Sequence, residues 1–122
     1  MNYRLCVNIA TCTRWFLIGR KKILIIPEKV KILHLDYDVS LADNIHDRGG
    51  DLFGQVDFLC QKIRLNAGAS EEQKKETLLH EIIHAMDEKF RIGLKERQVE
   101  QLGVAIYNLV KDNPEMFNDD SE

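Results

Sequence analysis

The sequence lacks the features that mark secreted and membrane-spanning proteins. It has only three cysteines, with no Cys-x-x-Cys spacing, and an odd number of this kind favours free thiols in a reducing compartment over a disulfide framework. No uncharged apolar run approaches the roughly 20 residues that a membrane span needs. Arg14 and the basic run at residues 20–22 interrupt any secretory signal. We therefore expect a cytoplasmic protein with no membrane segment.

A strong excess of one charge is also missing. The 122 residues carry a net charge of −3, with 44% hydrophobic and 30% charged residues. This composition is typical of one globular domain, and it predicts no nucleic-acid partner. Residues 1–35 nevertheless hold seven Lys or Arg against one acid, which leaves −9 for the remainder. The basic segment at residues 1–28 is either a solvated extension or a contact for an acidic partner, a membrane surface or nucleic acid.

The first half of the chain is rich in strand-forming residues. β-branched and aromatic side chains cluster at residues 30–35, 53–59 and 62–65, and each run has the length of a strand. Residues 43–51 contain Asp, Asn and Gly in a density that is typical of a loop. We expect three strands from this half of the chain.

The second half is helical. Ser70 can cap a helix that begins with two acids, and Gly93 suits the left-handed conformation found where helices end. A second helix is expected from about residue 95 to residue 111, where Asn113-Pro114 stops it. Its expected buried stripe consists of Val99, Leu102, Ile106, Leu109 and Val110. Residues 118–122 have the composition of an acidic tail.

The first of these helices carries the motif His80-Glu81-Ile82-Ile83-His84. Residues four apart lie on one helix face, so His80 and His84 can bind one metal ion together. Zinc lowers the pKa of its water to roughly 7, and Glu81 can take a proton from that water and pass it to a leaving amine. The alternative is a pair of partly buried histidines that have hydrogen-bond partners and no metal.

A catalytic zinc ion usually has three protein ligands and one open position. The second helix offers Glu96 and Glu100. With Val99 at zero on the helical wheel, Glu96 lies at about 60° and Glu100 at about 100°. Glu96 is nearer the buried side and is the first choice of ligand, whereas Glu100 either holds a histidine N–H or the Glu96 carboxylate, or replaces it as ligand. Gly103, at about 40°, leaves room for the metal.

Other polar side chains have weaker claims to a role in the site. His34 and His46 are either oxyanion donors or ordinary surface histidines, and Tyr107 is either a donor to a tetrahedral intermediate or a half-buried core residue. Asp87, one turn after His84, either orients a ligand histidine or is exposed.

The run Thr77-Leu78-Leu79-His80-Glu81-Ile82-Ile83-His84-Ala85 resembles the active-site helix of gluzincin-type metallopeptidases. It is most similar to the small ImmA/IrrE-like proteins of bacteriophages and mobile elements. Residues 54–65, residues 96–103 and the closing Asp112-Asn113-Pro114 also fit this family. Gluzincins often place an acid four positions after the ligand Glu, although here that acid is Glu100 rather than the commoner Asp.

The resemblance covers residues 29–117 and implies one α+β, zincin-like metallopeptidase domain. In such a domain a three-stranded, largely antiparallel sheet packs on the active-site helix and a second C-terminal helix. The resemblance also implies a protein or peptide substrate, because relatives include peptidases that cleave a repressor of mobile-element genes. The oligomeric state is not predicted.

Two functions follow from these residues. The first is zinc-dependent hydrolysis of peptide bonds, with the edge strand near residues 54–59 holding an extended substrate by strand addition. The second is a non-catalytic regulatory or interaction module that the same zinc ion stabilises.

Overall fold

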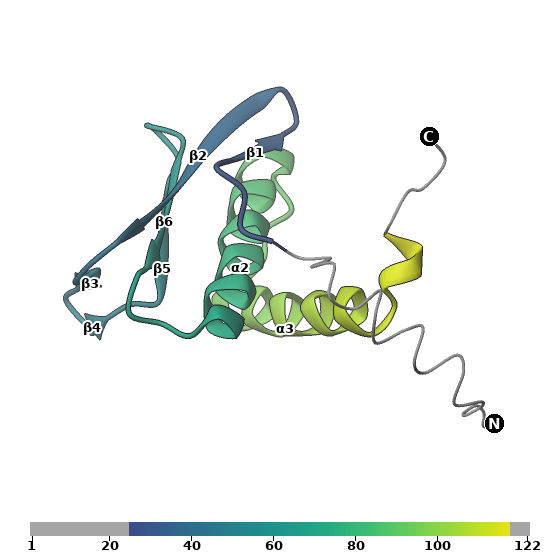
Figure 1. Ribbon diagram of the computed structural model, residues 1–122. Coiled ribbons are helices and arrows are strands. Elements are labelled where there is room, and N and C mark those ends of the chain that lie inside the picture. The colour runs from purple at the N-terminus through teal and green to yellow at the C-terminus, as the bar shows by residue number, and fades with distance from the viewer. Residues whose placement is uncertain (1–24, 118–122) are drawn as a thin grey trace.

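The computed structural model describes residues 25–117, and Figure 1 shows how their strands and helices are arranged. Most of the basic segment at residues 1–28 and the whole acidic tail at residues 118–122 lie outside the described residues. The described elements, in chain order, are β1 (Lys29–Ile32), β2 (Leu35–Ala42), β3 (His46–Asp47), β4 (Gly50–Asp51), β5 (Gly54–Asp57), β6 (Lys62–Asn66), α2 (Glu71–Phe90), α3 (Glu96–Asp112) and the 3-10 helix η1 (Pro114–Met116).

Four strands form one mixed sheet in the order β1-β2-β6-β5. The outer pairs, β1 with β2 and β5 with β6, are antiparallel, whereas β2 and β6 run parallel in the centre. Strands β3 and β4 form a separate hairpin within the expected loop. The domain is α+β, as expected. Its sheet, however, has a fourth strand and a parallel pair that the expected three-stranded, largely antiparallel sheet did not contain.

The fourth strand exists because the chain turns where one continuous strand was expected. Leu33 has a φ of 58°, in the left-handed region that favours glycine, and Ile32 pairs with Leu35 across the turn. The expected strand at residues 30–35 is therefore the end of β1, a tight turn and the start of β2. Tyr37 in β2 is fully buried between exposed neighbours, as in a strand with one face on the core.

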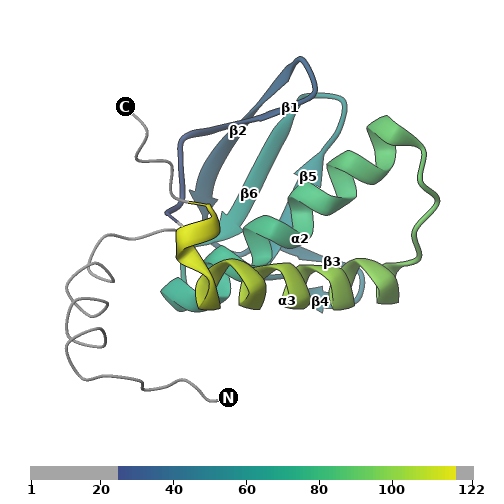
Figure 2. The same cartoon turned by 90° about the vertical axis from the view of Figure 1, so that its right-hand side faces the viewer.

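Helix α2 lies between the sheet and α3, as Figures 1 and 2 show from two directions. Its inner face joins the sheet in one hydrophobic core, and Ile26, from the segment before β1, packs against that core. The buried residues of the core are Ile32, Tyr37, Ile63, Leu65, Leu78 and Ala85. The core therefore fixes the position of α2, which carries the histidine motif.

The start of α2 follows the sequence prediction, and its end lies earlier. The Ser70 hydroxyl accepts a hydrogen bond from the backbone N–H of Gln73 at 3.1 Å, as an N-cap does. The helix ends at Phe90, and Arg91 is the left-handed capping residue with a φ of 55°. Gly93, the expected end, lies two residues further on with a φ of 86°.

Helix α3 turns a narrower face inward than expected. The buried residues of α3 are Val99, Gly103, Tyr107 and Val110. Leu102 and Leu109, expected in the buried stripe, are 40% and 47% exposed. The reason is that, among the described elements, α3 packs against α2 and η1 alone. No helix within residues 25–117 has both the length and the apolar character needed to cross a membrane.

Candidate metal centre

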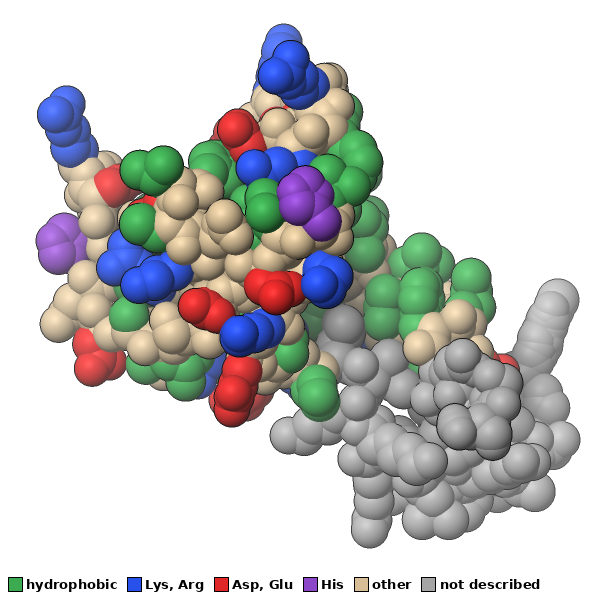
Figure 3. Space-filling model, turned by 90° about the horizontal axis from the view of Figure 1, so that it is seen from above, with side chains coloured by type: hydrophobic (Ala, Val, Ile, Leu, Met, Phe, Trp, Pro, Cys, Tyr) green, Lys and Arg blue, Asp and Glu red, His purple; other side chains and the backbone are tan. Residues whose placement is uncertain are grey.

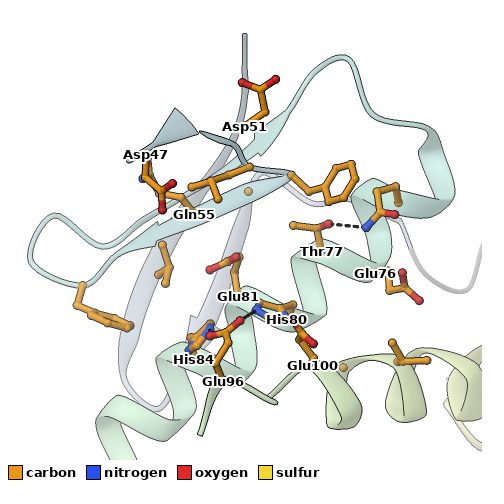
Figure 4. Close-up of a pocket in the computed structure, with 18 residues that line it drawn as sticks. Asp47, Asp51, Gln55, Glu76, Thr77, His80, Glu81, His84, Glu96 and Glu100 are labelled. Carbon is orange, nitrogen blue, oxygen red and sulfur yellow. Dashed lines mark hydrogen bonds and ion pairs between the residues drawn. The ribbon is translucent and has the colours of Figure 1, made fainter. Parts of the chain in front are cut away.

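The two histidines of α2 meet the first residue of α3. Nε2 of His80 lies 3.0 Å from Oε2 of Glu96, and Nε2 of His84 lies 2.9 Å from Oε1 of the same carboxylate. The imidazole rings are 4.8 Å apart between centroids, at an interplanar angle of 69°. Figure 4 shows both rings turned toward Glu96. His80, His84 and Glu96, which the sequence analysis selected as candidate ligands, therefore lie close together in space.

This group could hold a metal ion, since the three ligand atoms lie within 4.8 Å of one another. Donors about 2.0–2.1 Å from a tetrahedral zinc ion are about 3.3 Å apart. The separations of 2.9 and 3.0 Å between nitrogen and oxygen would need to widen by only a few tenths of an ångström. Two imidazoles and a carboxylate suit zinc and other divalent first-row ions. The donor set therefore fits a divalent cation without a change of fold.

The other acid of α3 is placed differently. Glu100 lines the same cleft, but it is not in the group that could hold a metal ion. One turn of α3 separates it from Glu96. Glu96 is thus the third ligand that the geometry favours, and no histidine N–H within residues 25–117 donates a hydrogen bond to Glu100.

The connection between the helices brings Glu96 to the histidines. Oδ1 of Asp87 accepts hydrogen bonds from the backbone N–H groups of Gly93, at 2.7 Å, and Leu94, at 3.1 Å. The N–H of Lys95 then donates to Oε1 of Gln98 at 2.9 Å, at the start of α3. Asp87 was expected either to orient a ligand histidine or to be exposed. Instead it holds the turn, a role that depends on a chain reversal the sequence pattern did not show.

A glycine lets α3 approach the first histidine closely. A Cβ atom built on Gly103 would lie 3.6 Å from Cα of His80, at ordinary van der Waals contact. The fully buried Val99 packs one turn earlier in α3. A side chain longer than methyl at position 103 would therefore push α3 away from the backbone of His80.

Glu81 is a buried carboxylate beside this group. Its side chain is 7% exposed and lines the cleft, and no hydrogen bond to it is seen among the described residues. Burial, followed by the nearby negative charge of Glu96, raises the pKa of Glu81 to about 7. A carboxyl group that can gain and lose a proton near neutral pH is suited to general acid–base work.

The cleft itself runs between α2, the start of α3 and the edge strand β5 (Figure 4). Its volume of about 720 Å³ lies within the roughly 300–1,000 Å³ that ligand-binding clefts span. Strand β5 lies at the edge of the sheet, so one side of its backbone has no partner strand in the part of the chain that the structure describes. Gly54 permits β5 to lie on α2, because a Cβ there would come within 2.5 Å of Cγ2 of Thr77.

The remaining polar candidates lie outside the cleft. His34 and His46 are exposed, and Nδ1 of His46 is 2.8 Å from the backbone oxygen of Asn44. Tyr107 is buried and its hydroxyl donates to Glu72. Burial, followed by this hydrogen bond, raises the pKa of Tyr107 to about 12. These contacts support the structural alternatives for all three residues.

We compared the chain with known protein families, curated proteins and solved structures, and found no match. No protein-family model matches the chain, no curated protein matches it, and no solved structure matches its fold. The resemblance to gluzincins accordingly rests on the motif residues themselves.

Proposed function

We propose that this protein is a zinc-dependent metallopeptidase that hydrolyses peptide bonds in a protein substrate. One observation carries the proposal: His80, His84 and Glu96 converge in one cleft beside the buried residue Glu81. The finer classification as a zincin-like, ImmA/IrrE-like peptidase of the cytoplasm, acting on a regulatory protein of a phage or mobile element, is part of the same proposal.

In this proposal three side chains bind the metal ion and a fourth transfers the proton. His80, His84 and Glu96 hold the cation, and the side-chain exposure of Glu96, 60%, leaves one side of the group open to the cleft. A bound zinc ion supplies Lewis acidity toward a water molecule and a scissile carbonyl. Glu81 accepts the proton that the attacking water loses and delivers it to the nitrogen of the leaving amine.

Strand β5 is suited to hold the substrate. Its free edge can pair with an extended peptide, whose backbone would then lie along the cleft above Glu81. Val56 and Gln55 of this strand line the cleft. Pairing through the backbone explains how one site can bind a peptide segment without requiring one sequence.

A purely structural zinc site is less well supported. Structural zinc ions normally have four protein ligands, and the group found within residues 25–117 has three. A structural ion also needs no neighbouring proton acceptor, whereas Glu81 lines the cleft there and has no hydrogen bond from another residue in the range 25–117. Both features favour the catalytic alternative over a zinc-stabilised interaction module.

The test compares the purified parent protein with two variants and two matched controls. We expect about one zinc ion per chain in the parent and in Glu81→Gln, and a large loss of zinc in His84→Ala. Peptide hydrolysis should fall about 10²- to 10⁴-fold in Glu81→Gln, with the circular dichroism spectrum unchanged. His34→Ala and Glu115→Gln, at exposed positions, should behave as the parent.

Two results would contradict the proposal. If Glu81→Gln hydrolyses peptides as fast as the parent, Glu81 is not the proton acceptor. If zinc removal unfolds the chain and no variant affects any hydrolysis, the zinc-stabilised module is the better description.

A further inference from the structure

The cleft carries an excess of negative charge beyond what the metal group uses. Six carboxylate side chains line it, and no Lys or Arg among residues 25–117 does. Glu81 and Glu96 belong to the proposed hydrolytic centre. The four that remain are Asp47, Asp51, Glu76 and Glu100.

These four acids are not neutralised by the rest of the described chain. The ion pairs within residues 25–117 involve other carboxylates, on Asp36, Glu71, Glu72 and Glu96. Asp47 accepts one backbone hydrogen bond, from the N–H of Gly49 at 2.7 Å. Like charges gathered in a concave site add their fields and attract counter-charges into it.

The acids stand on both sides of the metal group. Glu76 lies on α2 one turn before His80, and Glu100 lies on α3 one turn after Glu96. Asp47 and Asp51 come from the small β3–β4 hairpin next to strand β5. In Figure 4 Glu76 and Glu100 lie on one side of the histidines, and Asp47 lies across the cleft near Gln55. A peptide lying along the cleft would therefore have carboxylates on both of the walls that flank it.

Apolar surface is interleaved with these charges. Phe53 and Val104 line the cleft and are 57% and 46% exposed, and Phe58 at its rim is 37% exposed. The face of the molecule in Figure 3 looks different, because acidic and basic side chains alternate over it. The lining of the cleft therefore differs in charge from this face.

Acidity alone would not identify a binding site. Here two independent features point to a ligand in the same place: the buried carboxylate of Glu81, which faces the cleft with no partner among the described residues, and the free edge of β5. A peptide that paired with this edge and reached Glu81 would lie among the four surplus acids.

From this arrangement, and resting on the proposed function, we propose that the cleft selects cationic peptide segments. Its substrate would be an extended stretch with Lys or Arg on each side of the scissile bond and apolar residues between them. Asp47 and Asp51 would contact basic side chains that point to one wall of the cleft, and Glu76 and Glu100 those that point to the other. Segments rich in Asp or Glu would be repelled.

The experiment uses two fluorescent peptides with the same apolar centre, one flanked by Lys and the other by Glu. Binding is measured by anisotropy to full-length Glu81→Gln protein loaded with zinc, and kcat/KM is measured with the parent. Exposed charge pairs each contribute a few-fold, so four acids predict about a 10-fold or larger preference for the Lys peptide. Screening should reduce this preference when the ionic strength rises from about 0.05 M to about 0.5 M.

Variants then locate the effect. Glu76→Gln combined with Asp47→Asn should lower the preference about 3- to 10-fold, with an unchanged circular dichroism spectrum. Glu88→Gln combined with Glu115→Gln removes the same number of charges from exposed positions outside the cleft lining. This control pair should keep the full preference.

The outcomes separate this inference from the hydrolase proposal. Preferential binding of the Lys peptide without cleavage supports the inference and counts against hydrolysis. Cleavage of both peptides at equal kcat/KM supports hydrolysis and overturns the inference. A preference that survives high salt, or that both double variants lower equally, also overturns it.

Discussion

Asp87 offers a test of how the chain positions its third ligand, because among the described residues it makes no hydrogen bond to the histidines and does not line the cleft. Its Oδ1 atom accepts two backbone hydrogen bonds that fold the α2–α3 connection. Net contributions of about 1 kcal/mol for each such bond predict that Asp87→Ala weakens the connection by about 2 kcal/mol. A loss of about 2 kcal/mol is about 30-fold in an equilibrium constant. We expect the zinc Kd to rise by about 10- to 30-fold, while helix α2 stays folded.

Asp87→Asn is the matched control. Both N–H groups donate to the same oxygen, and an amide oxygen can accept them in the same way. The asparagine variant should therefore keep zinc affinity within about 3-fold of the parent. Competition with a chromophoric chelator measures the Kd of each protein, and circular dichroism measures the helix. Equal affinity in the parent and in Asp87→Ala would refute the idea that this turn places Glu96.

Three further predictions concern other parts of the structure. Glu96→Gln should weaken zinc binding at least about 10-fold, whereas Glu100→Gln should change it less than about 3-fold; a chelator titration in which the two are equal contradicts the ligand assignment. Gly54→Ala should lower the free energy of unfolding by about 1–3 kcal/mol, because its Cβ would overlap Cγ2 of Thr77, and Thr77→Ser in the same chain should restore part of it in urea titrations. Tyr107 has a pKa raised from 10.0 to about 12, so the stability that its protonated form contributes is complete below pH 10 and is lost as the pH rises toward 12. Urea midpoints measured across this window should fall more steeply in the parent than in Tyr107→Phe, and parallel curves would contradict the assignment.

The helical half of the fold was predictable because its signals are local. The cap at Ser70, the spacing of the two histidines and the stop at Asn113-Pro114 are each written within a few residues of sequence. The choice of Glu96 over Glu100 also came from a local quantity, the angle around one helix. The computed structure brings Glu96 and the histidines together.

The sheet was less predictable because its pairing joins distant residues. Leu33 adopts a positive φ without being Gly, Asn or Asp, so the β1–β2 turn had no composition signal. The parallel pairing of β2 with β6 depends on the path of everything between them. The same holds for Asp47 and Asp51, which belong to a loop by composition and join the cleft only through the placement of the β3–β4 hairpin.

The position of α2 between the sheet and α3 has a consequence for how this protein can change. Leu78 and Ala85 anchor one side of the helix in the core, His80 and His84 project from the other, and Glu81 lies between these two sides. A substitution that repacks the core will rotate or shift α2, and with it the imidazoles of His80 and His84. Variants selected only for greater thermal resistance should thus often alter metal affinity as well, since one segment of chain serves both purposes.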